Sequence, residues 1–290
     1  MSLPSSLLAW TKQLVKQYNL RPGRRLGQHF LIDRQVLEQI MAAAELKPAT
    51  PVLEVGGGLG ALTLSLLNTT PRLTVVELDK NLAPLLQKLG LAAEHFKVIS
   101  GDILKVSDKV LQQSLSLEPD DDFYIVANLP YEISGAFLRR FLSGVWRPEI
   151  MVLLLQAEVA ERLVAKPGEV SLLTLQAWLA AEVKIIKKVR PSSFYPPPRV
   201  NSAIVKFKLR TVEERIALLS GLSEEYFWQV AKAGFTARRK YLISNLHRQL
   251  KFDKSKLIEI FKKLDIPLSV RAQELSLEQW AELAGGLNKE

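Results

Sequence analysis

Short apolar runs rich in β-branched residues alternate, over the first two thirds of the chain, with segments whose apolar positions have helical spacing. The strand-like runs are residues 52–55, 73–77, 97–99, 123–127 and 150–155. The helix-like segments are residues 5–18, 33–46, 60–68, 80–90, 105–115 and 133–143. Strands that alternate with helices in this way predict a parallel sheet with helices on both of its faces.

The rest of the chain follows a different pattern. A predicted helix at 170–180 is followed by two predicted strands at 183–189 and 200–209. Their connection, RPSSFYPPPR, leaves no room for a crossover helix, so we expect these two strands to be antiparallel. Beyond about residue 212 only helices are predicted, at 223–233, 236–250, 254–264 and 276–285. The sequence therefore predicts an α/β domain with a seven-stranded mixed sheet in residues 1–211 and a small all-helical domain in residues 212–290.

The composition excludes several kinds of site. The chain has no cysteine, which rules out disulfides, thiolate zinc sites and cysteine nucleophiles. Its three histidines, His29, His95 and His247, lack the spacing of metal ligands, and we expect no metal. No apolar run approaches the roughly 20 residues of a membrane span, and the N-terminal residues lack the pattern of a secretory signal. A cytoplasmic protein that does not enter a membrane is expected.

Positive charge is concentrated in parts of the chain. The net charge is +9, and residues 183–210 contain eight Lys or Arg and no acidic residue. Basic segments of this kind suit a polyanionic partner such as nucleic acid. Solvated surface lysines would give the same composition, so charge alone leaves both interpretations open.

A glycine-rich turn follows the first predicted strand of the sheet, in VLEVGGGLGALT (52–63). Gly56, Gly58 and Gly60 have the spacing G-x-G-x-G, which permits positive φ and lets a ligand approach the backbone closely. This spacing differs from the G-x-G-x-x-G of dinucleotide-binding folds, which seats a pyrophosphate. Taken by itself, the motif fits a ligand-binding loop and a simple tight turn equally well.

Polar residues stand at the ends of the next three strands. Glu77 in VVELDK can accept hydrogen bonds from a ribose diol, Asp102 in ISGDIL can accept one from an adenine amino group, and Asn128 ends the following strand. Helix capping would explain any one acid, but these residues and the glycine turn all border the crevice of an open α/β sheet. They predict a site for an adenosine-containing cofactor. The absence of a Walker lysine and of a pyrophosphate motif favours S-adenosylmethionine over ATP or NAD.

The stretch ANLPYEIS (127–134) ends a buried strand with an amide, a proline and a phenol. A methyl transfer to a base amine is helped by neutral acceptors that bind both amine hydrogens and aim the lone pair at the methyl group. We interpret the Asn128 side chain and the backbone carbonyls of Leu129 and Pro130 as these acceptors. The ring of Tyr131 offers a stacking face for a base that has left its helix. Ordinary turn chemistry is the alternative interpretation of the same residues.

Seven motifs, taken together, resemble those of the ribosomal RNA adenine N6-dimethyltransferases of the KsgA type. In chain order they are RLGQHFLID (25–33), LEVGGGLGALT, VVELDK, GDIL, NLPYEIS, FYPPPRVNSAIV (194–205) and FTARRKYLISNL (235–246). The resemblance extends over nearly the whole chain. It implies a Rossmann-like class I S-adenosylmethionine-dependent methyltransferase fold with a helical C-terminal domain that binds rRNA. The implied activity is the dimethylation of two adjacent adenosines in the 3′-terminal hairpin of small-subunit (16S) rRNA, by a monomeric enzyme of ribosome biogenesis.

The same resemblance implies the residues of the site. The family's cofactor contacts correspond to His29, Leu31, Gly56, Glu77, Asp102 and Asn128, and Gly58 belongs to the same glycine turn. Its target-base stack corresponds to Tyr131 and Phe194. Position 29 is often asparagine in the family, and the turn often reads GPG. A solvated loop histidine and a core phenylalanine are the alternative interpretations of His29 and Phe194.

Basic residues expected to bind RNA lie in the last third of the chain. Arg238, Arg239, Lys240 and Arg248 are predicted on or near one stripe of the 236–250 helix, with Lys232 just before it. We interpret them as contacts to RNA phosphates, with a solvated basic helix as the alternative. Three other functions stay open: a related macrolide-resistance enzyme that acts on large-subunit (23S) rRNA, a non-enzymatic assembly or transcription factor on the same fold, and a DNA amino-methyltransferase.

Overall fold

The computed structural model describes residues 3–22, 28–90, 93–118, 121–144 and 146–288. Positions 25–27 of the RLGQHFLID motif lie outside these ranges. The chain forms two compact units. The first consists of Met1–Ala160 and Val183–Leu209, and the second of Glu161–Glu182 and Arg210–Glu290.

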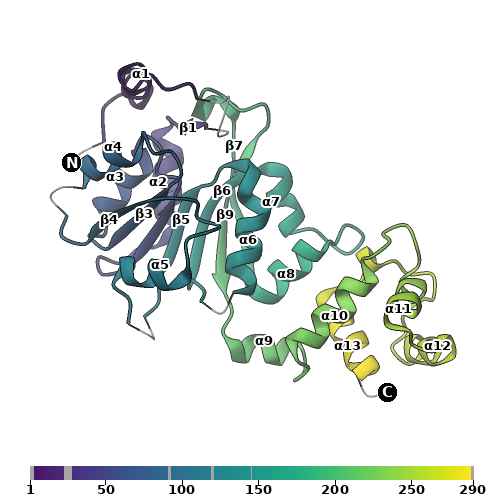
Figure 1. The fold of residues 1–290 in the computed structure, drawn as a ribbon. Helices are drawn as coiled ribbons and strands as arrows, with labels where there is room; N and C mark the ends of the chain where they lie inside the picture. The colour runs from purple at the N-terminus through teal and green to yellow at the C-terminus, as the bar shows by residue number, and fades with distance from the viewer. Residues whose placement is uncertain (1–2, 23–27, 91–92, 119–120, 145, 289–290) are drawn as a thin grey trace. The chain divides into compact units, whose positions relative to one another are not determined.

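A seven-stranded mixed sheet forms the centre of the first unit (Figure 1). Its strands are β2 (Val52–Val55), β3 (Leu73–Glu77), β4 (Phe96–Ser100), β5 (Tyr124–Asn128), β6 (Ile150–Gln156), β7 (Ala181–Val189) and β9 (Ser202–Leu209). They lie in the order β4-β3-β2-β5-β6-β9-β7. Strands β2 to β6 all run parallel to one another, and β9 runs antiparallel to β6. The predicted mixed sheet is confirmed, and its strand order changes direction at β2, which opens a crevice at the carboxyl ends of the strands.

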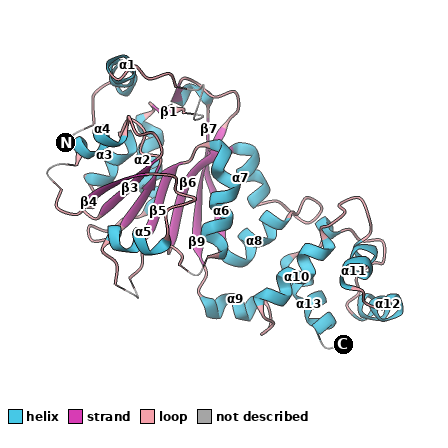
Figure 2. Ribbon diagram, in the orientation of Figure 1, coloured by secondary structure: helices cyan, strands magenta, loops and turns pink. Residues whose placement is uncertain are grey.

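Helices cover both faces of this sheet (Figure 2). They are α2 (Arg34–Ala44), α3 (Ala61–Leu67), α4 (Ala83–Leu89), α5 (Asp108–Leu115) and α6 (Ser134–Ser143), and α1 (Leu7–Gln17) precedes them in the chain. All residues of β2 and β3 are buried, as expected for strands with both faces covered. Several helices begin at a polar N-cap: the side chain of Asp33, for example, accepts hydrogen bonds from the amides of Gln35 and Val36.

A second, two-stranded sheet was not predicted from the sequence. Strand β1 (Phe30–Leu31) pairs antiparallel with β8 (Phe194–Tyr195). Each strand has two residues, and the partner is more than 160 positions away, so no local pattern marks the pair. Next to it, the ring nitrogen Nδ1 of His29 lies 2.7 Å from the carbonyl oxygen of Pro196, and the amide of Ile32 donates to the carbonyl of Ser193. These bonds fix the His29 segment against the proline-rich loop.

The second unit is helical. Its helices are α8 (Leu172–Ala180), α9 (Val212–Leu218), α10 (Glu224–Gly234), α11 (Leu242–Leu250), α12 (Lys254–Lys263) and α13 (Leu277–Asn288). The aromatic side chains of Phe227, Phe261 and Trp280 are fully buried in its core. Helix α9 was not predicted, and neither was α7 (Ala157–Leu163), in which the chain passes from the first unit to the second.

The segment 161–182 belongs to the second unit, whereas the sequence pattern placed it in the first domain. Val170 and Leu175 of this segment are buried in the core of the C-terminal helices. The amides of Gly168 and Val170 both donate to the carbonyl of Gln273. An apolar helix has the same spacing whether it covers a sheet or joins a helical core, so the sequence pattern could not decide between the two.

The predicted helix 236–250 begins only at Leu242, as α11. The reason is the buried side chain of Asn245, whose Nδ2 donates to the carbonyl oxygens of Gly234 at 2.7 Å and Ala237 at 3.1 Å. These carbonyls are thereby satisfied by a side chain, which offers the backbone an alternative to a continuous helix. The expectation that residues 238–240 share one helical stripe with Arg248 is therefore wrong: they lie in the loop that precedes α11.

Candidate active site

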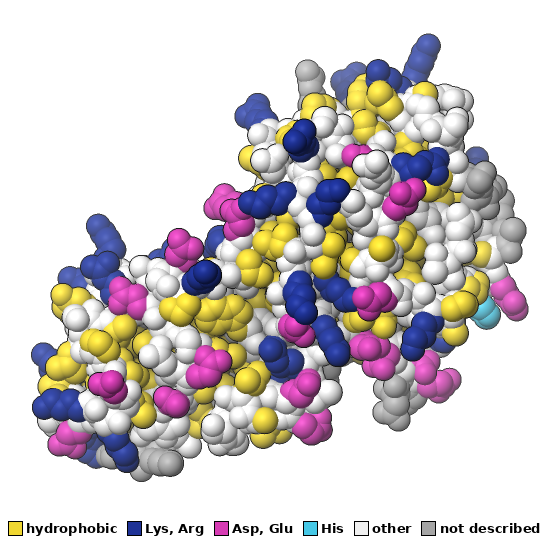
Figure 3. Space-filling view, turned by 180° about the vertical axis from the view of Figure 1, so that it is seen from behind, with side chains coloured by type: hydrophobic (Ala, Val, Ile, Leu, Met, Phe, Trp, Pro, Cys, Tyr) yellow, Lys and Arg dark blue, Asp and Glu magenta, His cyan; other side chains and the backbone are white. Residues whose placement is uncertain are grey.

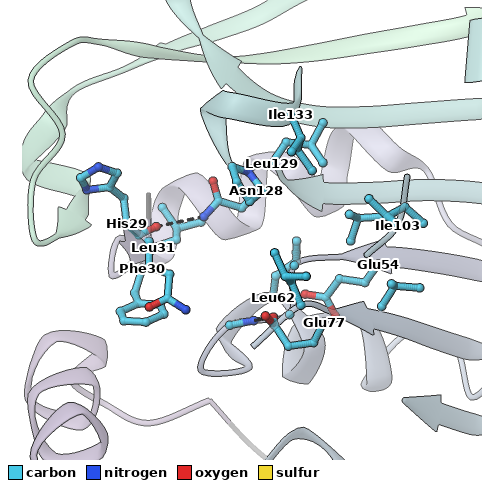
Figure 4. Close-up of a pocket in the computed structure, with 18 of the residues that line it drawn as sticks. His29, Phe30, Leu31, Glu54, Leu62, Glu77, Ile103, Asn128, Leu129 and Ile133 are labelled. Atoms are coloured by element: carbon cyan, nitrogen blue, oxygen red, sulfur yellow. Dashed lines mark hydrogen bonds between the residues drawn. The ribbon is translucent and has the colours of Figure 1, made fainter. Parts of the chain in front are cut away.

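A cavity of about 270 Å³ opens at the carboxyl ends of β2, β3 and β5. Figure 4 shows Glu54 and Glu77, from neighbouring strands, close together in this pocket, with Asn128 beside the His29 segment. All seven residues predicted to contact the cofactor line the cavity: His29, Leu31, Gly56, Gly58, Glu77, Asp102 and Asn128. The sheet thus gathers residues from separate segments of the chain into one site.

The glycine turn has the backbone that its spacing predicted. Gly56 has φ 75° and Gly58 has φ 57°, values in the left-handed region that glycine adopts without strain. A Cβ added at Gly56 would lie 3.6 Å from Cδ of Pro130, another residue that lines the pocket. Both glycines therefore keep the turn tight and leave its backbone accessible to a ligand.

The carboxylate of Glu77 is held by the backbone on both of its oxygens. Oε2 accepts a hydrogen bond from the amide of Gly58 and Oε1 accepts one from the amide of Asp79, each at 2.8 Å. The side chain is buried, and this burial raises the pKa of Glu77, although the backbone donors oppose the change. Fixed in this way, the carboxylate keeps its remaining lone pairs for a ligand that donates hydrogen bonds, such as a diol.

A second buried acid, Glu54, was missed in the sequence. It lines the cavity with 1% of its surface exposed, and its Oε2 atom has no hydrogen-bond partner among the described residues. Burial raises the pKa of Glu54 to about 8, the nearby Thr63 hydroxyl opposes this rise, and the charge of Glu77 adds to it. The signal was an acidic residue inside the apolar run VLEV, two positions before the glycine turn.

Asp102 lines the cavity just beyond the end of β4. Its Oδ1 accepts a hydrogen bond from the amide of Leu104 at 3.0 Å, and its Oδ2 lies 3.8 Å from Nζ of the exposed Lys105. The side chain is 29% exposed, which leaves it accessible from the cavity. It is both a local turn residue and an acceptor within reach of a ligand.

The amide of Asn128 is oriented by the backbone of His29. Its Nδ2 donates to the carbonyl oxygen of His29 at 3.1 Å, drawn as the dashed line in Figure 4. This hydrogen bond assigns the orientation of the amide, and it leaves Oδ1 as an acceptor. The side-chain carbonyl that the sequence interpretation required is therefore available.

The two backbone carbonyls after Asn128 differ from each other. The carbonyl oxygen of Pro130 accepts hydrogen bonds from the amide of Ile133 at 3.2 Å and from the hydroxyl of Ser134 at 3.4 Å. This carbonyl thus already has two donors, from the 3₁₀ turn Tyr131–Ile133 and from the start of α6, and its role as an acceptor for the amine stays a prediction. No hydrogen bond to the carbonyl oxygen of Leu129 occurs among the described residues.

The ring of Tyr131 has two neighbours near the pocket. Its hydroxyl lies 2.7 Å from the hydroxyl of Ser202, which is fully buried on β9. The centroid of its ring lies 5.9 Å from the centroid of the His29 ring, and the angle between the two ring planes is 28°. Burial raises the pKa of Tyr131, so the phenol is neutral at ordinary pH. The pocket therefore ends in a neutral aromatic ring of fixed orientation.

The family model described as Ribosomal RNA adenine dimethylase matches residues 20–289 of this chain. The chain belongs to this family. A relative from Dehalococcoides mccartyi (strain CBDB1), named Ribosomal RNA small subunit methyltransferase A, is 41% identical over 278 residues, which are 96% of this chain and 92% of the relative. A relative of the same name from Clostridium botulinum (strain Okra / Type B1) is 34% identical over 276 residues, 94% of this chain and 97% of the relative.

Two solved structures share the fold. A dimethyladenosine transferase from Plasmodium falciparum has a TM-score of 0.75 and 26% identity, and the match covers 90% of this chain and 98% of that one. The 23S rRNA methyltransferase ErmE has a TM-score of 0.68 and 25% identity, over 89% of this chain and 99% of that one. The predicted class I methyltransferase fold is confirmed.

Phe194, which the family resemblance placed in the target-base stack, lies outside the pocket. Phe194 does not line the cavity, and with 2% of its surface exposed it packs in the main hydrophobic core of the first unit. Its pairing with Leu31 in the small two-stranded sheet holds it there. A base could stack on Phe194 only if the side chain left the core, so the geometry gives the stacking role no support.

The basic residues expected to bind RNA are not among those that line the pocket. Lys232, Arg238, Arg239, Lys240 and Arg248 are all exposed and belong to the second unit. Basic side chains occur on both units over the face drawn in Figure 3, with acidic and apolar ones between them. Charge alone therefore does not single out one RNA-binding surface in this dimethylase.

The described residues contain neither a metal-binding cluster nor a membrane-spanning helix. Among the described residues, no group of three or more His, Cys, Asp or Glu side chains could hold a metal ion. Within the same ranges, none of the helices has both the length and the apolar character that a bilayer crossing requires.

Proposed function

We propose that the protein transfers methyl groups from S-adenosylmethionine to the N6 amines of two adjacent adenosines in the 3′-terminal hairpin of small-subunit (16S) rRNA. The observation that carries this proposal is the orientation of Asn128, whose Nδ2 is bound to the carbonyl of His29 so that Oδ1 is left as an acceptor. Beside it stand the carbonyl of Leu129, with no partner among the described residues, and the ring of Tyr131.

These groups suit an exocyclic amine. Its lone pair is delocalised into the base, so the amine is a weak nucleophile. In the first transfer, Asn128 Oδ1 and the Leu129 carbonyl accept the two amine hydrogens, and in the second transfer one of these oxygens accepts the single hydrogen that remains. These contacts orient the lone pair and favour the charge that the nitrogen gains in the transition state. The Tyr131 ring stacks on the extruded base, and the phenol, being neutral, brings no charge of its own. When bound, the cofactor would supply an electrophilic methyl group on a sulfonium, with the electrons of the broken carbon–sulfur bond left on the sulfur. The surplus amine proton leaves to solvent.

The pocket also suits S-adenosylmethionine. The glycine turn is a cradle that any Cβ at Gly56 or Gly58 would narrow, and Glu77 presents a fixed carboxylate to the ribose hydroxyls. Asp102 accepts from the adenine amino group. The unpartnered Oε2 of Glu54 provides an acid for a cationic group of the cofactor, whose charge would lower the pKa of that acid and favour its ionised form.

The small-subunit substrate is supported by the relatives. Those named Ribosomal RNA small subunit methyltransferase A are 34% and 41% identical to this chain, whereas the 23S rRNA methyltransferase ErmE is 25% identical. The assembled pocket argues for catalysis over a purely non-enzymatic assembly role, and nothing in the described residues is specific to DNA. The protein acts as a monomer in the cytoplasm on small ribosomal subunits, with its second unit on rRNA.

Tritiated S-adenosylmethionine offered to the protein with unmethylated small subunits, large subunits and DNA tests this proposal. We expect label only in small subunits, recovered as N6,N6-dimethyladenosine after nucleoside analysis. Label found only in large subunits or only in DNA would show that small-subunit rRNA is not the substrate. Asn128→Ala should reduce turnover by about 10²-fold or more, as for the loss of one preorganised hydrogen-bonding group.

A matched control is Asn68→Ala. Asn68 is the C-cap of α3 and does not line the cavity, so its loss should leave turnover unchanged. If Asn128→Ala turned over like Asn68→Ala, the amine would be held by other groups.

A further inference from the structure

A second hollow of the first unit lies between the end of β7, the turn that follows it and the start of α2. It is lined by Asp33, Gln35, Val36, Lys187, Lys188, Val189, Arg190, Ser192, Ser193 and Asn201. We call this the β7 groove. Nothing in the catalytic geometry described above uses it.

The β7 groove is cationic. Lys187, Lys188 and Arg190 line it, and Asp33 is its single carboxylate among the lining residues. That carboxylate is already committed to the fold. Its Oδ1 accepts from the amides of Gln35 at 3.0 Å and Val36 at 3.4 Å, and its Oδ2 accepts from the hydroxyl of Ser193 at 2.8 Å. Asp33 is thus held by hydrogen bonds within the fold, and the exposed Lys187 and Arg190 give this side of the groove a positive charge.

Two of these cations are also without an internal partner. The side chains of Lys187 and Arg190 are exposed, and neither forms a hydrogen bond or ion pair with another described residue. Prevention of pairing with another sheet is a common role of lysines on an edge strand such as β7. That role needs no hollow, no neighbouring hydroxyl such as Ser192 and no arginine beyond the end of the strand, all of which occur here.

The groove is joined to the catalytic pocket through one short strand. Leu31 of β1 lines the pocket, and Asp33, two residues further on, lines the groove. Two residues of extended chain span about 7 Å. The pocket and the groove therefore border neighbouring residues of one short segment. A strand whose base occupied the pocket could therefore place a nearby phosphate in the groove.

We infer that the β7 groove binds backbone phosphates of the RNA strand next to the target adenosine, chiefly through Lys187 and Arg190. This inference rests on the proposed function. The contact would be directed at phosphates, so it positions the strand and carries no sequence information.

The test compares two charge-reversed proteins. Lys187→Glu/Arg190→Glu changes the groove, and Lys88→Glu/Lys109→Glu makes the same change of charge at exposed lysines of α4 and α5. Affinity for unmethylated small subunits is measured over a range of salt, beside cofactor titration and steady-state methylation. The groove variant loses two phosphate contacts, so we expect the magnitude of its slope of log K against log salt to decrease by about 1.5. The α4/α5 variant should keep the slope of the wild type. The KM of the groove variant for subunits should rise while its cofactor affinity stays unchanged.

A second variant guards against an effect of folding. Lys187→Arg/Arg190→Lys keeps both charges and should bind and methylate like the wild type. If the groove variant matched the α4/α5 variant in slope and KM, the inference would be overturned while the proposed function stood. If the wild type placed no methyl group on small subunits, the proposed function would fail, whatever the groove variant did.

Discussion

The hydroxyl of Tyr131 lies 2.7 Å from the hydroxyl of Ser202, so the ring that ends the pocket is tied to a fully buried residue of β9. The sequence interpretation treated Tyr131 only as a stacking face. The structure adds a restraint on the orientation of that face, provided by a strand 71 positions further along the chain.

Because of this hydrogen bond, the stacking role of the Tyr131 ring and the orientation of the ring can be tested by different substitutions. Tyr131→Ala should leave cofactor binding nearly normal and impair methylation, because the base loses a stacking contact worth about 1–3 kcal/mol. Tyr131→Phe and Ser202→Ala should each retain most activity, since the ring remains. Single-turnover methylation beside cofactor titration measures all three. If Tyr131→Phe were as inactive as Tyr131→Ala, the hydroxyl would be required and the stacking account would be wrong.

Removal of the Glu77 carboxylate should weaken cofactor binding. Glu77→Ala takes a charged acceptor from the ribose and also frees the amides of Gly58 and Asp79. We expect a loss of about 1.5–3 kcal/mol in S-adenosylmethionine affinity, measured by calorimetry. Glu77→Gln keeps one carbonyl acceptor, and its affinity should fall between those of the wild type and Glu77→Ala. An unchanged dissociation constant for Glu77→Ala would remove this residue from the site.

The buried acid Glu54 should make the stability of the cofactor-free protein depend on pH. Its pKa is about 8 in the folded chain against an ordinary value of 4.5, so between these values the folded state holds a proton that the unfolded state has released. The free energy of unfolding should therefore decrease as pH rises from 5 to 8, by up to about 1.4 kcal/mol per pH unit from this group.

Glu54→Gln removes the titrating group and should flatten this decline. Denaturant unfolding at pH 5, 6.5 and 8 measures the effect for both proteins. Identical slopes would show that Glu54 does not hold a proton in the folded state at neutral pH.

The loop before α11 should contribute to RNA binding through charge. Replacing Arg238, Arg239 and Lys240 together by Ala should weaken binding to small subunits and reduce the salt slope by about 2–3, with cofactor affinity unchanged. The control replaces the exposed Lys251, Lys262 and Lys263 of the same unit by Ala. Equal slopes for the two triple variants would mean that the loop is ordinary solvated surface.

The second unit offers a paired test of packing at two helical glycines. A Cβ at Gly234 would lie 2.4 Å from Cη2 of Trp280, whereas a Cβ at Gly285 would meet nothing within 4 Å. Gly234→Ala should therefore destabilise the protein by about 1–3 kcal/mol. Gly285→Ala should stabilise it by about 0.5–1 kcal/mol, because alanine loses less backbone entropy in a helix. Thermal unfolding of both variants checks the contrast, and a neutral Gly234→Ala would show that Trp280 can shift.

The sequence by itself determined the sheet and the acids at its carboxyl edge. Strand periodicity, the glycine turn and Glu77 are local patterns, and parallel strands bring their carboxyl ends to one edge whatever the loops between them do. For this reason residue type and spacing suffice to predict that Gly56, Glu77 and Asn128 share one site. The motif resemblance to the family rested on the same local stretches.

Only the tertiary structure decided which polar groups stay available and which rings stay exposed. The carbonyl of Pro130 already accepts from its own turn and from the start of α6, and the amide of Asn128 is oriented by His29, 99 positions away. Phe194 is drawn into the core by a two-residue strand whose partner is Leu31. Such contacts depend on segments that meet only after folding, and residue type and spacing do not record which partner each group will find.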